Sequence, residues 1–158
     1  MKERPHSTFV HHRLIHVSDL DRDERKWFAS AIAGAIVSDS VVSPGQLSWI
    51  KNSLYFLSKK ERLTYLKHIK NKSSPPLTSL PNIDRDKAAK IFLDLILVMM
   101  ENFEIDTRET QFLVNAGKTL GIKEKRCMDV IRWAISLLDL FHEKERFVER
   151  IIRDEPNY

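Results

Sequence analysis

The chain has 158 residues, a mass of 18.5 kDa and a formal charge of +4, with 4 glycines, 6 prolines and 1 cysteine. This length suits a single domain that buries about two-thirds of its unfolded surface. The composition excludes a disulfide scaffold, a collagen-like chain and an intrinsically disordered chain. So few glycines also leave little material for phosphate-binding loops.

Nothing in the sequence resembles an export signal or a membrane span. Lys2 and Arg4 are not followed by an apolar segment of the kind found in signal peptides. The longest clean apolar run is residues 95–100, whereas a span needs about 20 residues. We therefore expect a cytoplasmic protein in which Cys127 is a small core residue rather than a nucleophile.

Capping residues and apolar side chains at helical spacing predict an all-α fold of about six to seven helices. The first of these helices carries apolar residues on several faces and is expected to be central. Gly121 is expected to end the helix that Asp106 caps. The expected helices cover about residues 19–37, 43–57, 58–71, 84–100, 106–120 and 123–154.

The spacing of apolar residues also predicts which helix faces are buried. Leu63, Leu66 and Ile69 are expected to face the core. In the last helix, one apolar stripe is expected from Val130 to Ile152, with a candidate hinge at the charged residues 143–146. Residues 73–83, rich in proline and serine, are expected to form the one substantial linker.

Residues 1–18 are expected to form an N-terminal arm, and residues 19–158 the helical bundle. Residues 8–17 are rich in β-branched and aromatic residues, so a short edge strand is the alternative to an arm packed on the bundle. His11, His12 and His16 lie in this segment, and two imidazoles four residues apart can bind zinc on a helix. The local residues favour extended structure instead, so we expect these histidines to be surface or packed side chains.

Two segments of the chain share one order of features: an apolar helix, an acidic or amide residue, a short turn and a capped helix. Placing Asp39 on Asn102 sets an offset of 63 residues (102 minus 39), and residue class then agrees through about thirty positions. Chance agreement between amphipathic helices is the alternative. The matched turn and cap favour an internal helix–turn–helix duplication, with halves at about residues 25–72 and 84–140.

These features resemble the TerB-like domains of tellurite-resistance proteins, where an Ala-rich apolar helix, an Asp-Gly-x-Ile-x-x-x-Glu motif and an amphipathic helix occur twice. Here residues 102–109 read Asn-Phe-Glu-Ile-Asp-Thr-Arg-Glu and lead to Leu-Gly-Ile at 120–122. Residues 39–46 read Asp-Ser-Val-Val-Ser-Pro-Gly-Gln. The resemblance covers about residues 25–140 and implies a single-domain, internally duplicated helical bundle from a bacterial cytoplasm.

The resemblance also implies a candidate metal site, because the acidic pairs of the family have been suspected of binding metal. Ser40 and Phe103 replace the two family glycines, and Gln46 replaces one of the glutamates. Glu109 also completes a capping box with Asp106, which is the alternative role for that residue. The candidate metal ligands are Asp39, Asn102, Glu104 and Glu109.

Residues 51–72 form a basic segment, with seven basic residues against Glu61 alone. Tyr55, Phe56 and Tyr65 are interleaved with these cations, a mixture that can contact phosphates and stack on bases. A solvated helix face or a protein contact needs only the same pattern. The candidate interaction patch is Lys51, Lys59, Lys60, Arg62, Lys67 and Lys70.

We therefore expect a non-enzymatic, TerB-like module for protein interaction or stress response, without a cofactor. A protein partner is expected, and a homo-oligomer is compatible with the separation of the acidic residues 94–109 from the basic residues 51–72. The first alternative is a weak divalent-metal-binding protein. The second is a protein that binds nucleic acid or an anionic surface through residues 51–72.

Overall fold

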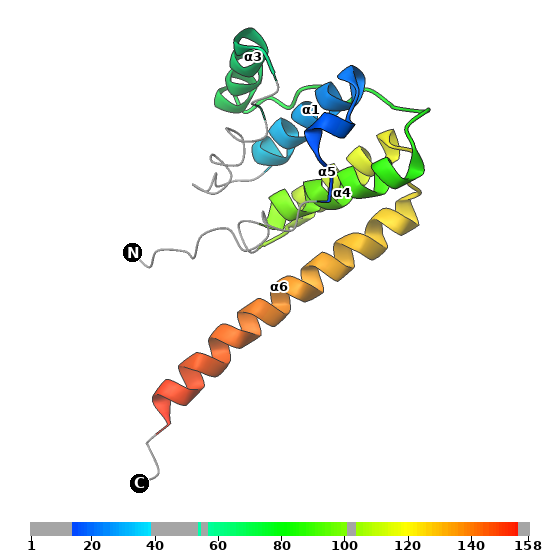
Figure 1. The fold of residues 1–158 in the computed structure, drawn as a ribbon. Coiled ribbons are helices and arrows are strands. Elements are labelled where there is room, and N and C mark those ends of the chain that lie inside the picture. Colours follow the sequence, from blue (N-terminus) through cyan, green and yellow to red (C-terminus); the bar gives the residue numbers. More distant parts are fainter. Residues whose placement is uncertain (1–13, 39–53, 55–56, 101–103, 155–158) are drawn as a thin grey trace.

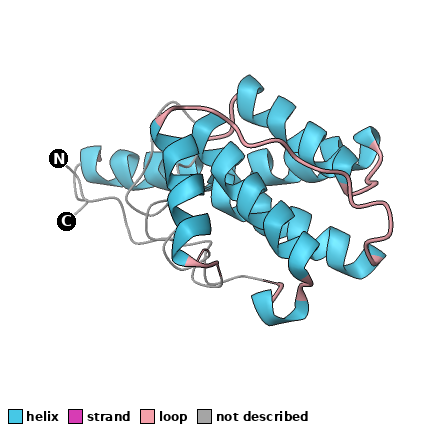
Figure 2. Ribbon diagram, turned by 90° about the horizontal axis from the view of Figure 1, so that it is seen from above, coloured by secondary structure: helices cyan, strands magenta, loops and turns pink. Residues whose placement is uncertain are grey.

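The computed structural model describes residues 14–38, 54, 57–100 and 104–154 (Figure 1). Within these ranges the chain is helical and contains no strand, which confirms the predicted all-α fold (Figure 2). None of the described helices combines the length and apolar character needed to cross a membrane. The elements are the 3-10 helix η2 (Val17–Asp19) and the α-helices α1 (Arg22–Ser38), α3 (Lys59–Lys70), α4 (Arg85–Met99), α5 (Thr107–Thr119) and α6 (Glu124–Arg153).

The described ranges hold five α-helices, against the six to seven expected. The helix expected over residues 43–57 lies outside the described residues, except for Leu54 and Leu57. Both of these leucines are buried, as their place in an apolar stripe predicts.

The core forms around α1 and α4. Helix α1 lies against α3, α4 and α5, and α4 also lies against α5 and α6. The expectation that α1 packs on several faces is confirmed, because small residues such as Ala29 and Ala33 are buried together with Trp27 and Phe28. Close packing extends to Gly34, where an added Cβ would lie 2.5 Å from a ring carbon of Phe112 on α5.

The helix ends follow the capping signals in the sequence. Ser58 accepts a hydrogen bond from the backbone N–H of Glu61, whose side chain accepts one from Ser58, so α3 begins with a complete capping box. The side chain of Asp84 accepts a hydrogen bond from the backbone N–H of Lys87 at the start of α4. After α5, Gly121 has a φ of +75°, a left-handed conformation that glycine adopts without steric cost.

Helix α3 corrects one expectation about buried faces. Leu63 and Leu66 are 56% and 44% exposed, and α3 has no buried residue. The helix packs instead through the half-buried Tyr65 and Ile69. The hydroxyl of Tyr65 lies 3.2 Å from that of Ser30 on α1. The opposite face of α3 is therefore open to solvent, although it carries leucines.

The last helix also differs from its expectation. Residues 143–146 do not form a hinge, because α6 continues without a break from Glu124 to Arg153. Its first half packs on the body, with Leu138 as its last buried side chain. Its second half projects beyond the other helices (Figure 1), so Val148, Ile151 and Ile152 are exposed rather than buried.

Candidate functional site

The candidate metal ligands are only partly within the described residues. Asp39 and Asn102 lie outside them. Glu104 is exposed, whereas Glu109 is buried and completes the predicted capping box with Asp106 at the start of α5. Within the described ranges, no three His, Cys, Asp or Glu side chains lie close enough together to hold a metal ion. Glu109 is thus engaged as a helix cap.

The candidate basic patch lies on α3, apart from Lys51, which is outside the described residues. The five remaining side chains are all exposed, and the leucines between them face solvent as well. Tyr65, which the sequence offered as a stacking residue, instead faces α1, where its hydroxyl approaches Ser30 and the backbone carbonyl of Lys26. The exposed cations of the patch are Lys59, Lys60, Arg62, Lys67 and Lys70.

Reversing three of these charges tests whether the patch is structural. The triple change Lys59→Glu, Lys60→Glu and Lys67→Glu should alter the free energy of unfolding by no more than about 1 kcal/mol, because exposed charges contribute little to stability. Thermal melts followed by circular dichroism would measure this. An unfolded triple variant would contradict the assignment of these lysines to a free surface.

A buried carboxylate joins the N-terminal arm to the core. Asp94, in the middle of α4, is fully buried. Its oxygens accept hydrogen bonds from the backbone N–H groups of Leu14 (2.9 Å) and Ile15 (3.1 Å), which lie about 80 residues earlier in the chain. The side chains of Ile15 and Val17 are buried in the same region. Asp94 therefore stabilises the described end of the arm on the bundle.

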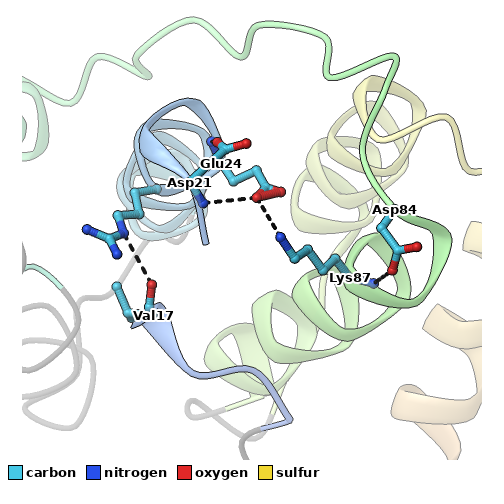
Figure 3. Close-up of polar contacts among 6 residues, drawn as sticks. Val17, Asp21, Glu24, Asp84 and Lys87 are labelled. Atoms are coloured by element: carbon cyan, nitrogen blue, oxygen red, sulfur yellow. Dashed lines mark hydrogen bonds and ion pairs between the residues drawn. The ribbon is translucent and has the colours of Figure 1, made fainter. Parts of the chain in front are cut away.

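An ion pair connects the starts of α1 and α4 (Figure 3). The backbone N–H of Asp21 donates a hydrogen bond to the Glu24 carboxylate, and the backbone N–H of Glu24 donates one to the Asp21 carboxylate. This is the pattern of a capping box. The Nζ of Lys87 lies 3.0 Å from the Glu24 carboxylate, which is 6% exposed. This hydrogen bond raises the pKa of Lys87 above its ordinary value. The stability that this ion pair contributes is therefore present at neutral pH. It is lost only as the pH rises through the raised pKa of Lys87.

Cys127 on α6 is packed against Gly117 of α5, and burial raises the pKa of its thiol. Such a thiol is mostly protonated at neutral pH and makes a poor nucleophile. A neighbouring pocket of about 450 Å³ lies between α4 and the start of α6. It is lined mainly by apolar side chains and by Arg85, whose guanidinium already donates to the backbone carbonyls of Leu120 and Gly121.

Helix α6 carries several large apolar side chains that are exposed. Side chains of this kind are normally scattered singly over a protein surface, and a contiguous group marks an interaction site. Sequence periodicity assigned Val148, Ile151 and Ile152 to the core, because it cannot tell how far the body extends, and it did not single out Trp133, Leu140 or Phe147. The large apolar side chains of α6 that are more than half exposed are Trp133, Leu140, Phe147, Val148, Ile151 and Ile152.

Comparisons of this chain with protein-family models, with curated proteins and with solved structures give no match.

Proposed function

We propose that this chain is a divergent TerB-like, non-enzymatic helical domain that functions through protein contact in a bacterial cytoplasm, in a stress response such as tellurite resistance. The observation that carries the interaction role is the apolar surface of the projecting half of α6. Leu140, Phe147 and Ile151 are 61%, 51% and 71% exposed there. Exposed apolar area of this extent is costly in water and is stabilised when a partner covers it.

The spacing of the helix starts supports the proposed duplication. The cap residues Asp21 and Asp84 are separated by the same 63 residues that separate Glu24 from Lys87, and this equals the offset derived from the sequence. Glu24 and Lys87 also occupy the same position, three residues after their caps, and they pair with each other. Equivalent residues that meet in this way are typical of two repeats packed about an approximate two-fold axis.

Site-specific photo-crosslinking tests the interaction role. The intact protein would carry p-benzoylphenylalanine in place of Phe147, a conservative aromatic change at a half-exposed site. The matched control places the same group at the neighbouring Arg146, whose side chain projects about 100° further around α6. Illumination in the native cytoplasm should give products containing a second polypeptide from position 147, and few from position 146. Equal yields at the two positions, or none at either, would contradict the proposal.

A further inference from the structure

Helix α6 carries two apolar stripes rather than one. The inner stripe, formed by Cys127, Ile131, Ala134 and Leu138, is buried against α4 and α5. A second set of residues follows the helix at alternating intervals of three and four residues. We call this set the outer stripe; it consists of the exposed Trp133, Leu140, Lys144, Phe147 and Ile151, together with the half-buried Val130 and Leu137, which also pack against the core.

The outer stripe has the repeat of a coiled coil. Alternating intervals of three and four residues average 3.5, which keeps one seam facing a partner helix over several turns. Trp133, Leu140 and Phe147 occupy one set of seam positions, and each is more than half exposed. Lys144 is the one charged residue among the other set, where a single polar side chain commonly specifies register.

We propose that residues 140–151 of the outer stripe pair in antiparallel orientation with the same residues of a second copy of this chain. This inference rests on the proposed interaction role of α6 and names its partner. A second copy fits because the seam is self-complementary, both in its apolar residues and in the charges beside it.

The charges favour the antiparallel arrangement. A parallel pair would place Lys144 against the same residue of its partner, so that two like charges would meet within the seam. In the antiparallel pair, Lys144 instead faces the partner's Phe147, a cation against an aromatic ring. Leu140 then faces the partner's Ile151.

The residues beside the seam agree with this register. Glu143 and Arg150 occupy equivalent flanking positions one heptad apart, and neither forms an ion pair within the described part of the chain. Antiparallel pairing brings Glu143 near the partner's Arg150, and the two-fold axis generates this contact twice. In a parallel pair, Glu143 would approach the partner's apolar Val148 instead.

Sedimentation equilibrium of the intact protein, over micromolar concentrations, tests the assembly. Wild type should form a dimer. Glu143→Arg should weaken it roughly tenfold, because it places two arginines together at both of the symmetry-related contacts beside the seam. The double variant Glu143→Arg/Arg150→Glu should restore most of the affinity. Glu149→Arg makes the same charge change away from the seam and should leave the affinity unchanged.

Disulfide trapping tests the orientation. Protein carrying Leu140→Cys mixed with protein carrying Ile151→Cys should crosslink to each other, whereas Leu140→Cys alone should not. Self-crosslinking of Leu140→Cys would show a parallel pair and would overturn the proposed register. Thermal melts of each variant verify folding, which these exposed positions should not affect.

The outcome separates the two proposals. A wild-type chain that stays monomeric at all concentrations, but still crosslinks to another protein through position 147, contradicts the second copy and leaves the interaction role standing. A monomer that also gives no crosslinked product contradicts both.

Discussion

Replacing Asp94 by alanine is expected to lower the free energy of unfolding by about 3 kcal/mol, since one buried and one partly buried backbone N–H group lose their acceptor. For a chain of this length, such a loss corresponds to a decrease in Tm of roughly 10 °C. The loss should be accompanied by release of the arm. Amide hydrogen exchange at Leu14 and Ile15 should therefore accelerate more than exchange in the centre of α5.

The control for Asp94 is another aspartate of the same helix. Asp86 forms an exposed ion pair with Lys90, four residues along α4. Asp86→Ala should change the stability by no more than about 1 kcal/mol, because exposed pairs contribute little. Asp94→Asn retains the size of the side chain and one acceptor oxygen. Its loss of stability should lie between those of Asp94→Ala and Asp86→Ala. Equal stability of Asp94→Ala and Asp86→Ala would contradict the anchoring role.

Replacing Gly117 by alanine is expected to destabilise the protein by about 2 kcal/mol, although alanine is the better helix former. An added Cβ would lie 2.3 Å from the Sγ of Cys127 and 3.2 Å from a ring carbon of Phe92. Both contacts are with fully or almost fully buried side chains, so α5 and α6 would have to move apart. Urea unfolding measures the change.

A second substitution identifies the cause of that loss. Cys127→Ala removes the sulfur atom, so Gly117→Ala should cost much less in that background, and the double-mutant cycle should show a coupling of about 1 kcal/mol or more. Asn115→Ala, at an exposed position of α5, should be neutral or slightly stabilising, because only helix propensity changes there. If Gly117→Ala also proved stabilising, the close approach of α5 and α6 would be wrong.

Local chemistry explains which parts of the fold could be predicted. The caps formed by Ser58, Asp84 and Asp106 depend on residues within one turn of the cap, so the sequence is sufficient to place them. The same reasoning anticipated the cap role of Glu109, but no local signal indicated that Asp94 would receive the arm. The one unusual feature in the sequence is an aspartate within an apolar helix. It indicates a buried polar group that needs hydrogen-bond partners, but it does not indicate which residues supply them.

The sequence by itself determined that this chain is helical and that α1 is packed on several faces. It also determined where α3, α4, α5 and α6 begin. Propensity, capping and periodicity suffice for this because they act over a few residues. Only the tertiary structure decided which apolar stripes are covered. Leu66 and Ile151 belong to stripes as regular as that of Ile131, yet only Ile131 is buried. Periodicity shows that a helix has an apolar face, whereas burial also requires another element opposite that face. For the projecting half of α6 that element is not among the described residues of this chain, and we propose that a second copy supplies it.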